Sequence, residues 1–405
     1  MEIRPIFSAL MRNKVSMILI GAQVALTLAI LCNALFIIGQ RLTHMNRPSG
    51  MNEADTFHFS SLVFAPGFNL ATTLQADLAL LRQLPGVAAA TPINSVPLSG
   101  IGWRANVKLQ PQQKTATART VVYPVDVQGL NTHGAKLIAG RDFKPAEVIE
   151  FNAEKHLQPT VVIVSKALAD TLFPDGDALG KQIYLKDDPP PATIIGIVER
   201  MQASWINDDT SIENATFIPA LLIDSGNQSS YLVRTEPGHR DEVMKAVEQK
   251  LAQANTGRII QEMRSMEQTR REAYAGDRAM AIILAVVVSA LLAITALGII
   301  GMASFWVAQR TKQIGTRRAL GATRGDILRY FQTENFIITT LGLIVGGILA
   351  YAFSFWLIQH YQTPRLPWHY VPIGFLCLWL LGQLAVLGPA LRATRVPPVV
   401  ATRSL

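Results

Sequence analysis

The segment of this chain that comes closest to a known chemical site is glycine-rich, Gly176–Lys181. A phosphate-binding loop needs four residues between its glycines, and a serine or threonine after its lysine to hold the metal ion. This segment has three residues between its glycines, and Gln182 follows the lysine. We therefore interpret it as a turn before a strand that contains Ile183.

The other candidates for catalysis or metal binding are scattered along the chain. The 7 histidines form neither an i, i+4 pair nor a His-Glu-x-x-His motif, and no Gly-x-Ser-x-Gly elbow occurs. Asp187–Asp188 and Asp208–Asp209 could act as paired carboxylates, but acidic pairs in loops are more often solvated. Cys32 and Cys377 lie in apolar runs, which indicates small buried residues rather than disulfide or metal ligands. We predict no catalytic residue, no metal site and no cofactor bound by this chain.

The segment with the most distinctive spacing is basic and follows a long apolar run. Arg310–Leu320 is predicted to form a short helix, with Gly321 at the position where a C′ glycine ends a helix. Thr323–Asp326 has capping-box spacing and opens a second helix, whose apolar stripe comprises Ile327, Leu328 and Phe331. This helix–turn–helix is either a lipid-facing linker or a docking element for a cytoplasmic partner.

Apolar runs flank this segment and must position it. The chain is 49% hydrophobic and 16% charged, against roughly 25% charged for an average soluble protein. A membrane-spanning helix needs about 20 apolar residues. The first run is interpreted as an uncleaved anchor, because no small-x-small cleavage site follows it. Four runs without Asp, Glu, Lys or Arg meet the length: 15–38, 279–307, 336–358 and 371–391.

The distribution of lysine and arginine predicts the orientation of these spans. Basic residues gather in the tail 1–14, the loop 308–335 and the tail 392–405, whereas the short loop 359–370 has only Arg365. By the positive-inside rule, both termini and the loop 308–335 are cytoplasmic, and residues 39–278 lie outside. The net charge of +8 is then largely a topology signal, and we predict no nucleic-acid partner.

The external residues have the pattern of a split α/β domain. Residues 52–97 and 229–264 each alternate as strand, helix and strand, and the insertion 98–228 between them is rich in strand patterns. Beyond Ile260 the pattern becomes helical and leads into the second span. The predicted fold class is therefore four transmembrane α-helices with a large extracytoplasmic α+β domain between the first and second helices.

The basic segment resembles the signature of the MacB/FtsX-like ABC transporter permeases (type VII), a run of the form R-T-x-E-I-G-x-R-x-A-L-G-A between the second and third spans. Gln313 stands in place of the usual glutamate, and Glu334 before the third span also fits the family. The residues that match the signature are Arg310, Thr311, Ile314, Gly315, Arg317, Ala319, Leu320, Gly321 and Ala322.

The resemblance extends over nearly the whole chain. The external part is similar to the family's periplasmic core domain at 139–143, 161–173, 179–181 and 194–198. The tail Pro389–Pro398 resembles the family's ending, with Pro397 where aspartate is common. The order of one span, an external domain and three spans matches the family as well.

The resemblance implies a function. The chain would be the permease of an ABC transporter in the inner (cytoplasmic) membrane, with no ATPase of its own. ATP and Mg²⁺ would be bound by a cytoplasmic ATPase subunit, whose motion the permease passes to its periplasmic domain by mechanotransmission. The expected cargo is a peptide, a lipoprotein or a hydrophobic small molecule. The alternative is an FtsX-like regulatory scaffold that switches a periplasmic hydrolase without transport.

The resemblance also assigns residues and partners. Expected partners are the ATPase, a second permease chain (identical or paralogous), a periplasmic adaptor and membrane lipid. Gln23 and Thr27 on the first span, and Gly342 and Gly346 on the third, are expected to serve helix packing, within one subunit or between two. The ATPase-coupling residues are expected to be Arg310, Gln313, Ile314, Arg317, Ala319, Leu320, Gly321, Ala322 and Arg324.

Overall fold

The computed structural model describes residues 14–64, 69–151, 159–185, 190–207, 210–223, 227–361 and 364–395. The chain divides into two compact units, which we call the helical unit (residues 1–46 and 276–405) and the α/β unit (47–275). The acidic pairs 187–188 and 208–209, and the tail residues before 14 and after 395, lie outside the described residues.

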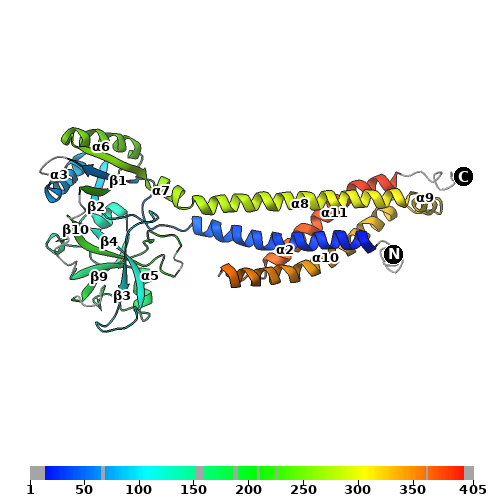
Figure 1. Ribbon diagram of the computed structural model, residues 1–405, viewed down its shortest axis with the longest axis horizontal. Helices are drawn as coiled ribbons and strands as arrows, with labels where there is room; N and C mark the ends of the chain where they lie inside the picture. The colour runs from blue at the N-terminus through cyan, green and yellow to red at the C-terminus, as the bar shows by residue number, and fades with distance from the viewer. Residues whose placement is uncertain are drawn as a thin grey trace. The chain divides into compact units, whose positions relative to one another are not determined.

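In the described part of the helical unit, four helices are long and apolar enough to cross a membrane (Figure 1). Each extends past the apolar run predicted for it, because polar residues continue the helix at one or both ends. The short loop 364–369 joins the last two helices. The helices are α2 (Lys14–Met45), α8 (Ala275–Gln309), α10 (Arg324–Tyr361) and α11 (Tyr370–Thr394).

The α/β unit contains a four-stranded antiparallel sheet that both halves of the split domain build together. Its strand order is β12–β1–β11–β2, so strands from the two halves alternate across it. Two helices, α3 and α6, cover the sheet with leucines and valines that pack on Phe57, Phe59 and Tyr231. The elements are β1 (Thr56–Val63), α3 (Leu70–Gln83), β2 (Val87–Ile93), β11 (Gln228–Thr235), α6 (Arg240–Ala254) and β12 (Arg258–Ser265).

The expectation of helix immediately after Ile260 was wrong. β12 runs on to Ser265 because it pairs with β1, where Arg264 lies opposite His58. The helix α7 (Met266–Ala273) begins only after Ser265, whose side chain accepts a hydrogen bond from the backbone N–H of Gln268 in a capping box.

The insertion forms a second, mixed sheet of eight strands with hydrophobic clusters on both faces. Its main order is β3–β4–β10–β7–β9–β5, while β6 pairs with β10 and β8 with β9. The strands are β3 (Trp103–Val107), β4 (Ala118–Val125), β5 (Leu137–Gly140), β6 (Ile149–Phe151), β7 (Val161–Ser165), β8 (Gln182–Ile183), β9 (Ala192–Val198) and β10 (Ala215–Leu222). The short helices are α4 (Gly129–His133), η1 (Pro145–Glu147) and α5 (Lys166–Leu172).

These observations confirm the predicted fold class: four candidate transmembrane helices, with an α/β domain between the first and the second. The predicted turn at Gly176–Lys181 is also observed. Gly176 and Gly180 both have positive φ, and β8 follows directly at Gln182. The Lys181 ammonium pairs with the Asp177 carboxylate at 2.9 Å on the surface.

We expect the stability of the α/β unit to fall as the pH drops from about 6.5 to 4. His133 is completely buried between the rings of Tyr123 and Phe217, and this burial lowers its pKa to about 4. Between these pH values the unfolded chain binds a proton that the folded unit excludes, so unfolding becomes easier. A pKa difference of this size corresponds to at most about 3 kcal/mol.

Thermal unfolding of the full chain at pH 7 and pH 4.5 measures this effect. His133→Gln removes the titrating group, so its unfolding temperature should depend less on pH than that of the wild type. An identical pH dependence in both proteins would show that His133 does not contribute.

Candidate functional site

The predicted basic helix is observed as α9 (Thr311–Ala319), at the end of the helical unit where α8 ends and α10 begins. Leu320 caps it, and Gly321 follows at a φ of 100°. The backbone N–H of Gly321 donates to Arg318 O at 3.1 Å, and that of Ala322 donates to Arg317 O at 3.0 Å. These two bonds form a Schellman motif, which needs a residue that tolerates positive φ at position 321.

The predicted capping box forms at the N-terminus of α10. The backbone N–H of Thr323 donates to the Asp326 carboxylate at 3.0 Å, and the Asp326 N–H donates to Thr323 Oγ1 at 3.2 Å. Two local motifs therefore fix the whole turn from Leu320 to Thr323, since each satisfies backbone groups that a helix end leaves open.

A buried ion pair fastens α9 to α10. Arg310, the N-cap residue of α9, donates from Nη1 to both carboxylate oxygens of Glu334, at 2.9 and 2.7 Å. The Glu334 side chain is 1% exposed and that of Arg310 12%. The Arg310 guanidinium also lies 5.9 Å from the ring centroid of Trp306 and donates to Tyr330 Oη at 3.3 Å. A charged hydrogen bond this well enclosed holds the two helices in one relative orientation.

Further contacts hold α9 in place from other directions. The Arg317 guanidinium lies 4.8 Å from the ring centroid of Tyr330, and Arg318 Nη1 donates to Thr394 O near the end of α11 at 3.2 Å. Tyr330 and Trp306 were not identified from the sequence. The available signal was the i, i+4 spacing that places Tyr330 and Glu334 on one face of α10.

The predicted coupling residues fall into two groups in the structure. Arg310, Ile314 and Ala322 face inward or are half-buried, so they support the turn. Leu320 is 83% exposed. The exposed members that a partner can reach are Gln313, Arg317, Ala319, Leu320, Gly321 and Arg324.

The predicted packing residues contact other helices of the same chain. A Cβ at Gly342 would lie 2.8 Å from Gly21 O, and one at Gly346 would lie 2.8 Å from Ala25 O, so both glycines let α10 approach α2 closely. Gln23 Nε2 donates to Ile294 O at 3.1 Å, and Thr27 Oγ1 lies 2.9 Å from Thr295 Oγ1; these bonds join α2 to α8. The packing that the structure shows is thus within one subunit.

No group of three or more His, Cys, Asp or Glu side chains within the described ranges could hold a metal ion. Cys32 is buried and Cys377 exposed, and both are free thiols in α2 and α11.

Two family models match the chain. The model described as MacB-like periplasmic core domain matches residues 24–250, and the model described as FtsX-like permease C-terminal matches residues 284–398. The second match includes all of α9 and the Arg310–Glu334 pair.

Curated relatives are similar at moderate identity. The macrolide export ATP-binding/permease protein MacB of Chromobacterium violaceum is 26% identical over 326 residues, which are 78% of this chain and 49% of that protein. An uncharacterized ABC transporter permease of Bacillus subtilis, YvrN, is 24% identical over 254 residues, 60% of this chain and 62% of that one. The chain spans about half the length of the MacB relatives. The periplasmic region of MacB from Actinobacillus actinomycetemcomitans, a crystal structure, has 14% identity and a TM-score of 0.35, over 57% of this chain and 97% of that one.

We expect Glu334→Gln to destabilise the helical unit by about 3 kcal/mol, because it leaves the Arg310 guanidinium buried without a counter-charge. Arg310→Gln should cost a similar amount for the converse reason. The double variant should lose clearly less than the sum of the two, since no lone charge remains. Unfolding of the full chain in detergent, followed by tryptophan fluorescence, measures all three.

The surface pair Lys166–Asp170 supplies the matched control, since both its side chains are more than half exposed. Asp170→Asn should change stability by less than about 1 kcal/mol. Strictly additive effects of the two Gln substitutions would mean that Arg310 and Glu334 do not stabilise one another.

Proposed function

Because this chain belongs to the family of FtsX-like permeases with a MacB-like periplasmic core domain, we propose that it is the permease subunit of an ABC transporter driven by a separate ATPase subunit. The ATPase would bind ATP and Mg²⁺, and this chain would contribute no catalytic group. The chain is a membrane protein by its helices and its family. We place it in the inner membrane, with both termini and α9 on the cytoplasmic side, because lysine and arginine concentrate there.

The exposed tip of α9 is the observation that carries this proposal. Leu320 projects from a turn that the Schellman motif, the capping box and the Arg310–Glu334 pair all hold rigid. Gln313, Arg317 and Arg324, on the same helix–turn–helix, are also exposed and supply polar groups. An apolar side chain in a polar rim is the usual anatomy of a protein contact. Burying one leucine in a pocket of the ATPase would contribute about 1.5–3 kcal/mol to binding.

The same contacts provide a route by which a movement of α9 would be transmitted to α8 and α10. Arg310 is the single residue between α8 and α9, and its ion pair with Glu334 ties α9 to α10. A push on α9 would therefore displace α8 and α10 together. Through Tyr274, α8 continues in sequence into α7 of the α/β unit. In mechanotransmission the periplasmic domain moves although no cargo passes between the helices. The connection from α9 through α8 to α7 would be sufficient for such a movement.

The proposed cargo is a peptide, a lipoprotein or a hydrophobic small molecule, and the last agrees with the macrolide export named for the MacB relatives. We propose two permease chains per complex, identical or paralogous, and a periplasmic adaptor as a further partner. The apolar runs of the helices contain no charged residue of the kind that marks an ion or polar-substrate pathway.

Leu320→Glu combined with Arg317→Glu should detach the ATPase, because the change removes the apolar tip and reverses the charge beside it. We expect the tagged full chain, purified in mild detergent, to recover at least fivefold less ATPase activity than the wild type. The yield of the permease itself should not change.

Arg365→Glu is the matched control, since it makes the same charge reversal on an exposed residue past the opposite end of α10. Equal recovery of ATPase activity by the double variant and this control would refute α9 as the docking element. Recovery of a murein hydrolase in place of an adaptor would favour the regulatory scaffold over the exporter.

Labelling of single cysteines tests the orientation, in a Cys32→Ala/Cys377→Ala background. Lys245→Cys on α6 and Thr316→Cys on α9 are both exposed positions. An impermeant maleimide should label position 245 in intact spheroplasts, and position 316 only after lysis. Labelling in the reverse pattern would overturn the proposed topology.

A further inference from the structure

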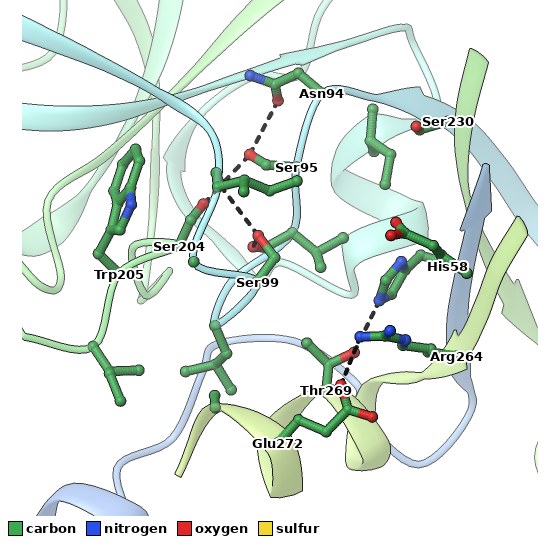
Figure 2. A pocket seen from close by; sticks show the side chains of 18 of the residues that line it. His58, Asn94, Ser95, Ser99, Ser204, Trp205, Ser230, Arg264, Thr269 and Glu272 are labelled. Atoms are coloured by element: carbon green, nitrogen blue, oxygen red, sulfur yellow. Dashed lines mark hydrogen bonds and ion pairs between the residues drawn. The ribbon is translucent and has the colours of Figure 1, made fainter. Parts of the chain in front are cut away.

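A cleft of about 960 Å³ lies within the α/β unit, between the four-stranded sheet and the sheet of the insertion (Figure 2). One wall comes from β1, β11, β12 and α7, with His58, Arg264 and Thr269 among its residues. The other wall comes from the insertion, with Arg104 on β3 and Arg119 on β4. Its volume is that of a site for a drug-sized ligand.

Two arginines lie on the insertion wall. The pairing of Arg104 with Val121 makes Arg104 and Arg119 diagonal neighbours on the same face of the sheet. Neither forms an ion pair with any described residue. The Arg104 guanidinium stacks 4.0 Å above the ring centroid of Trp205, which orients it at the edge of the cleft. Each guanidinium group provides a forked set of N–H donors that suits an acidic group of a ligand, and the strand register puts both arginines on one face of the sheet.

The opposite wall carries little unbalanced positive charge. Arg264 Nη1 pairs with the Glu272 carboxylate at 2.6 Å. His58 Nε2 lies 2.8 Å from Thr269 Oγ1, and burial together with the nearby Arg264 lowers its pKa to about 4, so the ring is neutral at pH 7. Glu262 also lines this wall. Among the described residues that line the cleft, the positive charges without an ion-pair partner are those of Arg104 and Arg119, which favours an anionic group beside them.

The floor between the walls combines hydroxyl groups with apolar side chains. Ser204 Oγ donates to Ser95 Oγ at 3.3 Å, and Ser95 Oγ donates to Asn94 Oδ1 at 3.2 Å, as Figure 2 shows. Gly102 is required beside them, because a Cβ at this position would lie 2.7 Å from Ser95 Oγ. The apolar lining consists of Ile93, Val96, Leu98, Ile101 and Ile206.

Backbone strain is concentrated at this cleft. Among the described residues, Leu98 (φ 69°) and Glu262 (φ 53°) are the two non-glycine residues with positive φ, and both line it. Glu262 lies where the register of β12 on β1 shifts, and Leu98 is held by its N–H bond to Ala203 O at 3.3 Å. Non-glycine residues held at positive φ tend to occur at ligand sites.

We propose that this cleft binds an organic anion with an apolar body, whose acidic group is held by Arg104 and Arg119 and whose apolar body packs beside Trp205. The two guanidinium groups supply the charge recognition, the serines supply additional hydrogen bonds, and Trp205 with the isoleucines supplies the apolar contact. This site lies wholly in the α/β unit, so the proposal does not depend on the docking of an ATPase at α9.

Calorimetric titration of the full chain in nanodiscs of neutral lipid tests the proposal. The probe is 2-naphthalenesulfonate, and the neutral 2-naphthalenesulfonamide is its matched control. The sulfonate should bind at least tenfold more tightly than the sulfonamide. Arg104→Gln with Arg119→Gln should weaken sulfonate binding at least tenfold and leave sulfonamide binding unchanged, and Trp205→Leu should weaken both.

Lys245→Gln with Lys250→Gln removes the same charge from exposed positions on α6, outside the cleft, and should leave the sulfonate affinity unchanged. Thermal unfolding of each variant shows that it is folded. The proposal is wrong if the wild type does not bind the sulfonate, if both probes bind equally, or if the lysine and arginine variants lose affinity alike.

Discussion

The ion pair between Arg310 and Glu334 is the interaction on which the arrangement of the helical unit most depends. An unpaired charge at this depth would cost several kcal/mol, so each group requires the other. The pair crosses the turn, from the N-cap residue of α9 to a position well inside α10. The ion pair fixes the start of α9 against α10. The Schellman motif and the capping box then form in the one turn geometry that this arrangement allows. The exposed position of Leu320 follows from that geometry.

An equivalent constraint governs the α/β unit. Strands of the two halves alternate in the order β12–β1–β11–β2, so each strand pairs with strands of the other half and with none of its own half. Asp77 from the first half accepts hydrogen bonds from Tyr231 at 2.7 Å and from Arg258 at 2.9 Å in the second half, and all three side chains are buried. The insertion leaves the sheet after Ile93 and returns before Ser230, two residues that are paired. Its ends are thus held together, and Ile93 and Ser230 both line the cleft.

Local patterns explain what could be predicted from the sequence. The four apolar runs, the two strand–helix–strand units and the turn at 320–326 depend on residues close together in the chain, so periodicity and capping rules were sufficient. The far end of β12 could not be predicted in this way, since Met263 and Met266 have helical spacing and only the pairing with β1 keeps the segment extended. The Arg310–Glu334 pair and the cleft were missed because their residues meet only after folding. The cleft draws on segments from His58 to Ala273.

The four long helices of the helical unit differ in how closely they pack against one another. This difference affects how a movement of one helix is transmitted to the others. Gly342 and Gly346 bring the backbones of α10 and α2 into direct contact, and Gly374 of α11 admits Leu28 in the same way. By contrast, two single hydrogen bonds, from Gln23 and Thr27, and the Arg41–Asp277 ion pair at 2.7 Å connect α2 to α8. Hydrogen bonds between membrane helices contribute about 0.6 kcal/mol each on average, and close backbone packing at small residues is a further source of helix association. In its most apolar window α8 is 17% buried, against 56% for α2. In sequence α8 lies between α9 and α7 of the α/β unit, so the least buried of the four long helices is one of the two through which the chain passes between the two units.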